Sequence, residues 1–316
     1  MNHFIKVLYS SYFYFFFILL FFASFSKLQA QDNARDLFNK GYRYLAADKT
    51  KAIDFLSQSI ALDSSMVDAY FHRGIAYFKL DKFDKALDDF EKAKSLDPNL
   101  SILWMYKGFA YRNKGELDQA LEAFSNYISL NPTDTSAYSY ILRGKMKYEL
   151  GDFNGAINDY DMASKLKPFE EKYYYYRFEA QYGANQLKSA LKSVSNLIKI
   201  NPDFYGYYFY KGNIFNKMEL YDSAIFMYNI AVIKNYQNAD SYFFRAQSYA
   251  SLGKYEKALE DYNTAIVLNN TDGTYFSKRG NCKFSMGNKE GACKDWDEAG
   301  ALGYYEDFDK VKRVCE

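Results

Sequence analysis

The residues with the greatest chemical potential in this 316-residue chain are three cysteines near its C-terminus, Cys282, Cys293 and Cys315. A thiol can form a disulfide, bind a metal, or act as a nucleophile when a neighbouring base lowers its pKa. The only histidines are His3 and His72, far from the cysteines in sequence. The spacing also lacks the paired C-x₂₋₄-C of structural zinc sites. We therefore expect neither a metal site nor a catalytic thiol. Disulfide formation is the role that remains for these cysteines.

Motifs of the common catalytic sites are absent. The sequence contains no Gly-rich phosphate loop, no H-E-x-x-H and no G-x-S-x-G. We therefore expect a non-enzymatic protein without a cofactor. The chain has 40 basic and 39 acidic side chains, and this balance argues against a nucleic-acid partner, which would require a basic face. A protein or peptide partner is compatible with this charge balance.

A small residue followed twelve positions later by alanine recurs along the chain. The pairs are Gly74 and Ala86, Gly108 and Ala120, Gly144 and Ala156, Gly212 and Ala224, Ala246 and Ala258, and Gly280 and Ala292. The small residues of the last three pairs lie 34 residues apart. Self-similarity at this period is typical of stacked helical hairpins. The pattern predicts an all-α solenoid, which must position any functional residue.

With the small residue placed at position 8, the repeats share a set of aromatic and alanine positions. The eight units start near residues 34, 67, 101, 137, 171, 205, 239 and 273. Aromatic residues recur at positions 4, 11 and 24, and alanine recurs at positions 20 and 27. Positions 4, 8 and 11 share one face of a first helix, and positions 20, 24 and 27 share one face of a second. Small residues at 8 and 20 let the two helices approach closely.

This arrangement resembles the tetratricopeptide repeat (TPR) family, over about residues 34 to 303. The resemblance implies a right-handed α-solenoid of about eight helix-turn-helix repeats that binds proteins without chemistry. Two units depart from the pattern. The first is one residue short between Gly41 and Ala52, and the fifth has Phe178 at position 8 and Val194 at position 24. We expect a local irregularity near the fifth unit, because a bulky residue at a close contact should widen the hairpin.

Position 7 of every unit is basic, which suggests either a ladder for an acidic ligand or structural ion pairs. Four of these residues are arginines in units that carry aspartate at position 23: Arg73 with Asp89, Arg143 with Asp159, Arg245 with Asp261, and Arg279 with Asp295. The planar guanidinium suits a carboxylate. This matching by unit favours ion pairs between the two helices of a hairpin.

The resemblance to TPR proteins implies a concave groove lined by positions 2, 5, 9 and 12 of the first helices. The candidate ligand-binding residues there are Phe71, Ile75, Phe78, Met105, Phe109, Arg112, Tyr138, Tyr148, Tyr175 and Tyr182. Later units become polar at these positions, with Asn216, Gln247, Asn281 and Ser285. Such a groove would suit an extended or helical segment with apolar anchors. The alternative is that these residues only pack between neighbouring repeats.

The N-terminus has the pattern of a secretory signal. His3 and Lys6 precede the apolar run Tyr12–Phe25, and Ala30 precedes a polar segment. We expect residues 1–30 to be a signal peptide cleaved after Ala30, which places the protein in the periplasm or cell envelope. An uncleaved membrane anchor is the alternative, and a membrane would be a partner only in that case.

The C-terminal residues 304–316 are predicted to form a capping helix after the solenoid of residues 31–303. The segment resembles the end of exported bacterial TPR proteins. In an exported protein a disulfide at the exposed end is reasonable. Cys293–Cys315 would tie the cap to the eighth unit, and Cys282–Cys293 would instead join the two helices of that unit. We favour the first pairing.

Two functions are consistent with these features. The leading hypothesis is a cell-envelope scaffold that binds a partner segment in the concave groove. The second is a structural or assembly component of an envelope or outer-membrane complex that acts through its convex face or its cap.

Overall fold

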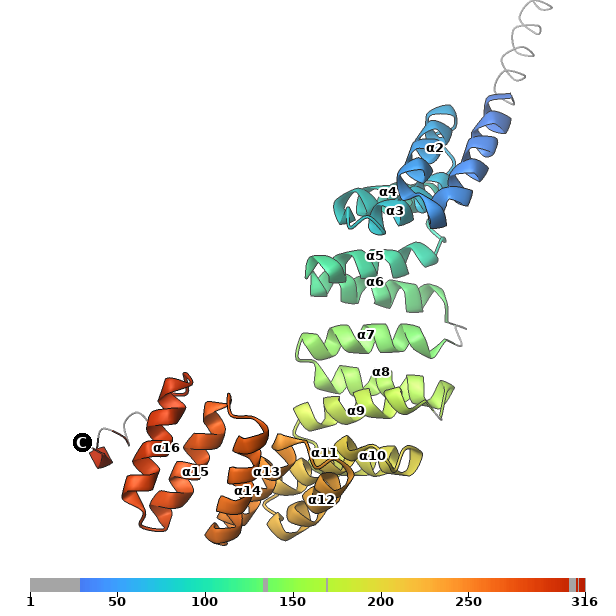
Figure 1. Ribbon diagram of the computed structural model, residues 1–316. Helices are drawn as coiled ribbons and strands as arrows, with labels where there is room; N and C mark the ends of the chain where they lie inside the picture. The colour runs from blue at the N-terminus through green and yellow to red at the C-terminus, as the bar shows by residue number, and fades with distance from the viewer. Residues whose placement is uncertain (1–28, 133–135, 169, 307–310, 312, 316) are drawn as a thin grey trace, which may run out of the picture. The chain divides into compact units, whose positions relative to one another are not determined.

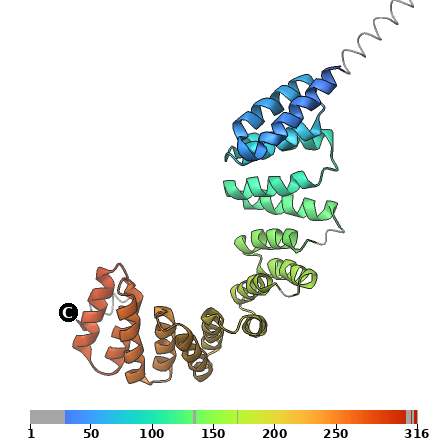
Figure 2. The ribbon, with the colours of Figure 1, turned by 45° about the vertical axis from the view of Figure 1, so that its right-hand side comes forward.

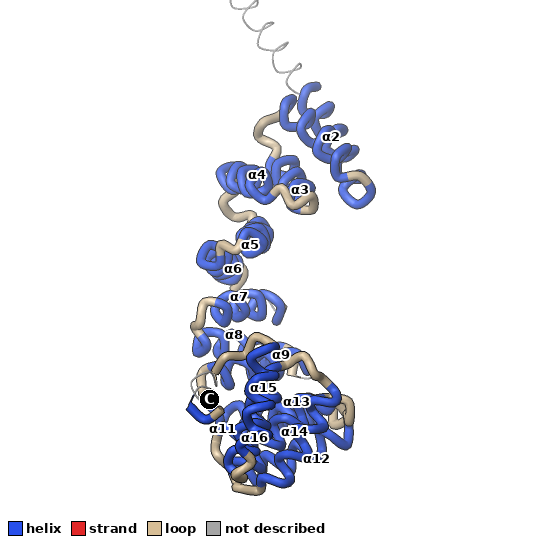
Figure 3. The backbone as a smooth tube through the Cα atoms, turned by 60° about the vertical axis from the view of Figure 1, so that its left-hand side comes forward, coloured by secondary structure: helices blue, strands red, loops and turns tan. Residues whose placement is uncertain are grey.

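The computed structural model describes residues 29–132, 136–168, 170–306, 311 and 313–315. Within these ranges the chain is a series of helices joined by short turns, with no strand (Figure 3). Residues 29–47 are helical, and fifteen bounded helices follow in the described part. The predicted all-α solenoid is confirmed.

The bounded helices alternate between the first and second helix of successive repeats. They are α2 (Lys49–Leu62), α3 (Val67–Phe78), α4 (Phe83–Leu96), α5 (Ile102–Lys114), α6 (Leu117–Leu130), α7 (Ala137–Glu149), α8 (Phe153–Leu166), α9 (Glu171–Gly183), α10 (Leu187–Ile200), α11 (Tyr205–Lys217), α12 (Tyr221–Lys234), α13 (Ala239–Ser251), α14 (Tyr255–Leu268), α15 (Gly273–Ser285) and α16 (Lys289–Ala301). From the second repeat on, each first helix begins within one residue of a predicted repeat start.

The chain forms two compact units, one up to Gly151 and one from Asp152. In the first unit α3 packs against α4 and α5 against α6 (Figure 1). In the second unit the hairpins are α9–α10, α11–α12, α13–α14 and α15–α16 (Figure 2). The predicted signal segment lies almost entirely outside the described residues. Among the residues that are described, no helix has both the length and the apolar character required to span a membrane.

Close contact inside a hairpin depends on glycine at position 8. A Cβ atom added to Gly74 would lie 2.6 Å from the ring of Phe90, and one added to Gly108 would lie 2.5 Å from the ring of Phe124. Both rings sit at position 24 and are fully buried. The aromatic side chain of the second helix therefore occupies the space that a side chain on the first helix would need.

The fifth repeat solves the same packing problem with the sizes exchanged. Phe178 replaces the small residue at position 8, and Val194 replaces the aromatic at position 24. Both are buried in one hydrophobic cluster with Ala190 and Leu197. The expected irregularity does not interrupt either helix, since α9 and α10 have 13 and 14 residues, as many as α11 and α12. The smaller valine leaves room for the larger phenylalanine.

The turn inside most hairpins contains one residue in the left-handed region, always at position 15. Four of these residues are glycines, and the others are Asp81, Asn185 and Glu219, with φ values of 56°, 57° and 60°. Asp and Asn tolerate this region better than other non-glycine residues. Glu219 is therefore the least suitable residue among them.

The first repeat lacks this turn residue. The helical segment 29–47 is separated from α2 only by Asp48, which is extended with φ of −147°. Its carboxylate caps the new helix by accepting a hydrogen bond from the Lys51 backbone N–H. The one-residue shortening seen in the sequence thus removes the left-handed position of the turn.

Arginines at position 7 form ion pairs inside the protein. Arg245 donates two hydrogen bonds to Asp261, of 2.7 and 2.6 Å, and Arg279 binds Asp295 in the same forked geometry. Arg73 does so with Asp89, whose hydrogen bond raises the pKa of the Arg73 guanidinium above its ordinary value.

Each of these arginines also reaches the preceding repeat. The third nitrogen of the guanidinium donates to a polar side chain sixteen residues earlier: Arg73 to Ser57, Arg245 to Asn229, and Arg279 to Asn263. Because each guanidinium donates hydrogen bonds both within its own repeat and to the preceding one, these arginines stabilise the stack and are not available to an acidic ligand.

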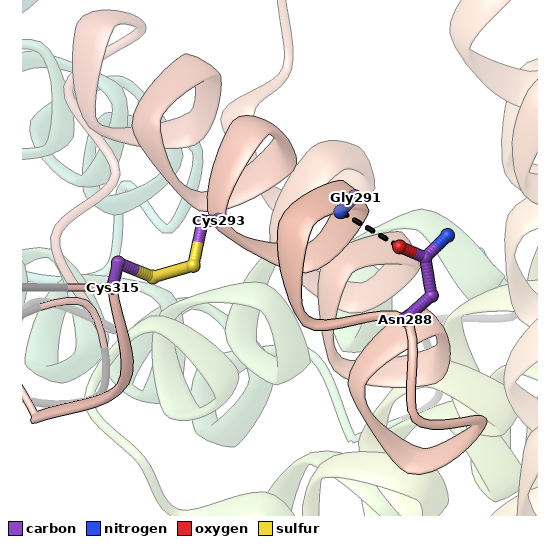
Figure 4. Close-up of a disulfide and its surroundings, with 4 residues drawn as sticks. All are labelled: Asn288, Gly291, Cys293 and Cys315. Atoms are coloured by element: carbon purple, nitrogen blue, oxygen red, sulfur yellow. Dashed lines mark hydrogen bonds between the residues drawn. A yellow bond between two sulfur atoms is a disulfide. The ribbon is translucent and has the colours of Figure 1, made fainter.

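At the C-terminal end, a disulfide joins Cys293 of α16 to Cys315 (Figure 4). Cys282 is buried and free. Asn288 caps α16 by accepting a hydrogen bond from the Gly291 backbone N–H (Figure 4). The expectation of a continuous helix over 304–316 is wrong at its start, because residues 304–306 are non-helical after the left-handed Gly303. Residues 311, 313 and 314 are helical and residue 315 lies in a turn, and residues 307–310, 312 and 316 lie outside the described residues.

Candidate functional site

The groove residues predicted in the first compact unit differ widely in exposure. Phe71 and Ile75 are each only 7% exposed, because they pack in the core formed by α3, α4 and α5. Phe78, Met105, Phe109 and Tyr148 are half-buried, whereas Arg112 and Tyr138 are exposed. Phe78 and Phe109 lie side by side, with ring centroids 6.5 Å apart. Phe71 and Ile75 therefore serve packing between repeats and offer almost no surface to a partner.

Arg112, at the C-terminal end of α5, has a carboxylate nearby. Its guanidinium lies 3.8 Å from the Glu149 carboxylate of α7. Both side chains are well exposed, so this contact adds little stability and leaves the arginine accessible.

The two groove residues predicted in the second unit both contact Phe178. Tyr175 and Tyr182 have ring centroids 6.2 and 6.0 Å from the Phe178 ring. The ring of Tyr210 from α11 lies 5.2 Å from Phe178 and 6.0 Å from Tyr175. The bulky residue at position 8 thus supports an aromatic cluster that spans two first helices.

A hollow of about 530 Å³ opens beside this cluster, between α9 and α11. Its lining is Glu170, Glu171, Lys172, Tyr175, Tyr176, Phe204, Tyr207 and Tyr210. We call it the tyrosine hollow. The N-cap residues and first turns of the two helices supply Glu170, Glu171, Lys172, Phe204 and Tyr207, and the second turns supply Tyr175, Tyr176 and Tyr210.

Hydrogen bonds hold the hydroxyl groups of the tyrosine hollow. The Tyr207 hydroxyl donates to the Glu171 carboxylate, which ties the start of α11 to the start of α9. Burial, together with this carboxylate, raises the pKa of Tyr207 above its ordinary value. Burial and hydrogen bonds with Tyr210 and Glu179 do the same for the pKa of Tyr175. Both phenols therefore stay neutral at physiological pH.

A second hollow of about 380 Å³ is polar and lies on α11, α13 and α15 with part of α14. Its lining includes Asn216, Gln247, Asn281 and Ser285, the polar residues that the groove positions predict for the later repeats. We call it the amide hollow. Amides and hydroxyls there could bind the backbone of an extended segment.

Sequence reasoning identified Tyr175 but missed most of the tyrosine hollow. Tyr176, Tyr207 and Tyr210 occupy positions 6 and 3, outside the expected groove positions, and Glu170 and Phe204 precede their helices. A signal was present in the run of four tyrosines at 173–176 and in the tyrosines that begin α11. Such local enrichment marks a departure from the ordinary repeat.

Comparison with known proteins agrees with the geometry of the hairpins. Family models described as tetratricopeptide repeat match residues 67–100, 101–134 and 239–272. The chain belongs to the tetratricopeptide repeat family. TPR folds are typically non-catalytic, and the repeats support a protein–protein interaction scaffold as the class of function. No curated protein shows significant similarity to this TPR chain.

Solved structures share the fold at low sequence identity. The C-terminal part of a TPR repeat-containing protein from Cytophaga hutchinsonii superposes with a TM-score of 0.63 and 18% identity, over 75% of this chain and 97% of that one. A structure of Naa15/Naa10 bound to HypK-THB gives a TM-score of 0.59 and 16% identity, over 85% and 42% of the two chains. MamA from Desulfovibrio magneticus RS-1 gives 0.51 and 17%, over 55% and 98%. At these identities the likeness concerns the fold alone.

Proposed function

We propose that this TPR protein is a cell-envelope scaffold that binds a segment of a partner protein along the first-helix face of its second compact unit. The tyrosine hollow carries this proposal, because a cavity lined mainly by aromatic rings with a few polar groups is the usual form of a binding site. The amide hollow lies on first helices of the same unit and would hold the polar parts of the same segment.

The proposed location has two supports. The N-terminal residues combine basic and apolar segments in the order of a secretory signal. The disulfide between Cys293 and Cys315 suits an oxidising compartment. N-terminal sequencing of the protein from its native envelope should begin at Gln31. A sequence that begins at Met1 would instead favour the uncleaved anchor.

A second candidate function is assembly through the second helices. Ile233 on α12 and Val267 on α14 occupy the same position of consecutive repeats and are 81% and 84% exposed. Apolar side chains this exposed on neighbouring repeats favour a contact surface.

Photo-crosslinking in the native host separates the two candidates. A benzoylphenylalanine placed at Tyr176 reports on the tyrosine hollow, and one placed at Ile233 reports on the second helices. The groove proposal expects one protein to recur in crosslinks from position 176 and to be absent from those at position 233. Crosslinks confined to position 233 would instead support the assembly function.

A further inference from the structure

The tyrosine hollow differs in chemistry from the equivalent place in an earlier repeat pair of the same chain. The residues 104 positions earlier are Met66, Val67, Asp68, Phe71, His72, Leu100, Leu103 and Tyr106. Five of them belong to or pack against one hydrophobic cluster. Packing between two consecutive repeats can therefore be achieved at these positions with mainly apolar residues. Tyr210 matches Tyr106, whereas the glutamates and Tyr175, Tyr176 and Tyr207 differ from their counterparts and call for a separate explanation.

Charge in the tyrosine hollow is negative. Glu170 and Glu171 give two negative charges, and Lys172 returns one positive charge, which leaves −1. The Lys172 ammonium is already occupied, since it lies 3.6 Å from Glu170 and 5.2 Å from the centre of the Tyr173 ring. Glu171 lines the hollow and is not paired with Lys172 in this way, and one of its carboxylate oxygens accepts a hydrogen bond from the Tyr207 hydroxyl.

The aromatic walls also favour a cation. The face of a neutral phenol ring carries negative electrostatic potential and attracts ammonium and guanidinium groups. The same first-helix face already shows this contact, because the Lys217 ammonium lies 4.8 Å from the centre of the Tyr182 ring. Tyr175 and Tyr207 are kept neutral by burial.

We propose that the tyrosine hollow is a subsite for an arginine or lysine side chain of the bound partner segment, with the aromatic rings around its stem and Glu171 facing its charge. This inference rests on the proposed function, because it assigns the chemistry of one anchor of that segment. The hollow exceeds a single side chain in volume, so residues flanking the anchor lie within it too.

Selection of linear twelve-residue peptides by phage display against the full chain provides the probe. Peptides that bind the wild-type protein should share one arginine or lysine. Its replacement by norleucine, which keeps an apolar stem and removes the charge, should weaken binding at least tenfold in a fluorescence anisotropy titration. Binding should also weaken as salt increases, because the contact is between charges.

Glu171→Gln is the matched protein variant. The amide oxygen can still accept from Tyr207, so the variant removes the charge while it keeps the size and the hydrogen bond. We expect a tenfold or larger loss for the arginine or lysine peptide and no change for its norleucine analogue. Glu260→Gln on α14, which changes an exposed carboxylate outside the hollow, should leave both affinities unchanged.

Gly206→Ala gives an independent test through shape. A Cβ on Gly206 would collide with the Phe204 ring, so this wall of the hollow must move while every charge stays in place. We expect weaker binding of the basic peptide with unchanged helix content by circular dichroism. An unchanged affinity would remove Phe204 from the subsite.

The outcomes separate the inference from the function on which it rests. If the selected peptides bind the first-helix face but carry no basic anchor, the subsite is wrong and the scaffold function stands. Displacement of the peptides by a neutral oligosaccharide such as chitotetraose, with Glu171→Gln without effect, would identify a sugar subsite and overturn the proposal. If no peptide is selected, both the inference and the groove function fail.

Discussion

The contact between α3 and α5 and the contact between α9 and α11 use the same repeat positions in opposite ways. At the contact between α3 and α5 the residues are mainly apolar, and together with α4 they form a buried cluster. Between α9 and α11 tyrosines and glutamates leave a hollow of about 530 Å³. A tyrosine hydroxyl requires a polar partner or water. Tyr207 is buried and finds its partner in Glu171, whereas Tyr175, Tyr176 and Tyr210 remain half-buried beside the hollow. The repeat scaffold thus tolerates loss of packing at one step of the stack.

Truncation of matched residues should give the largest contrast between the two contacts. Phe71→Ala removes a ring that is 7% exposed, and we expect the free energy of unfolding to fall by about 3–4 kcal/mol. Tyr175→Ala, at the same repeat position beside the hollow, should cost about 1–2 kcal/mol, since less area leaves the core. Urea titrations followed by circular dichroism measure both. Equal losses would mean that the hollow is as much a part of the core as the closed contact.

The exchanged sizes in the fifth repeat can be tested by exchanging them again. Phe178→Ala should lower the free energy of unfolding by about 3 kcal/mol, because Val194 is too small to fill the space. Adding Val194→Phe to that variant should restore about 1–2 kcal/mol, whereas Val194→Phe alone should destabilise by overpacking. A double-mutant cycle in urea gives the coupling. Additive effects would contradict direct packing between the two side chains.

Alkaline pH should affect the hollow through Tyr207, whose counterpart in the closed contact, Leu103, has no titrating group. The pKa of Tyr207 is higher in the folded protein than its ordinary value near 10. The stability that depends on the neutral hydroxyl is therefore complete below pH 10 and is lost as pH rises above it. The slope for one proton is at most about 1.4 kcal/mol per pH unit.

Tyr207→Phe cannot ionise, so its stability should decline less steeply than that of the wild type between pH 10 and 11. Urea midpoints over this range measure the difference. Tyr305→Phe, at an exposed position, should follow the wild-type curve. If the stabilities of Tyr207→Phe and the wild type fell in parallel with pH, the Tyr207 hydroxyl would not be buried as described.

The smallest effects are expected at the turns of the two hairpins. Glu219, in the α11–α12 turn, has φ of 60°, and Asp81, in the α3–α4 turn, has φ of 56°. Glu219→Gly should raise the free energy of unfolding by about 1 kcal/mol, because glycine adopts this region without strain. Asp81→Gly should gain less, since aspartate tolerates the region better. Thermal melts of both variants check the order, and a larger gain at Asp81 would reverse it.

Much of the fold follows from the sequence because its causes are local. Glycine at position 8 and an aromatic at position 24 recur in one pattern, and their contact requires only that the two helices be antiparallel neighbours. The Arg–Asp matching at positions 7 and 23 predicted the ion pairs of Arg73, Arg245 and Arg279 for the same reason. The Arg143–Asp159 pair remains a prediction.

The candidate site was harder to predict because exposure depends on neighbouring side chains. Phe71 and Tyr175 occupy the same repeat position, yet one is buried and the other lines a hollow. Positions 3 and 6, which supply Tyr207 and Tyr210, serve packing in the closed contact. Whether such a position faces a partner depends on the sizes and hydroxyls around it, which the repeat pattern does not encode.

The three cysteines differ in reactivity, because one is a buried thiol and the other two form a disulfide. Burial raises the pKa of Cys282 to about 11, so only about one molecule in a thousand carries the reactive thiolate at pH 8. The Cys293–Cys315 bond is the redox-sensitive element.

In a linear stack, a terminal repeat has a neighbour on one side only and frays first. The bond between Cys293 and Cys315 spans 22 residues of sequence. A closed loop of this size raises the cost of opening by about 3 kcal/mol. The disulfide therefore makes the two ends of the array unequal. Under tension or heat, α16 should open later when the bond is oxidised and earlier when it is reduced. The redox state of the surroundings thus sets how readily the α15–α16 hairpin opens relative to the repeats before it.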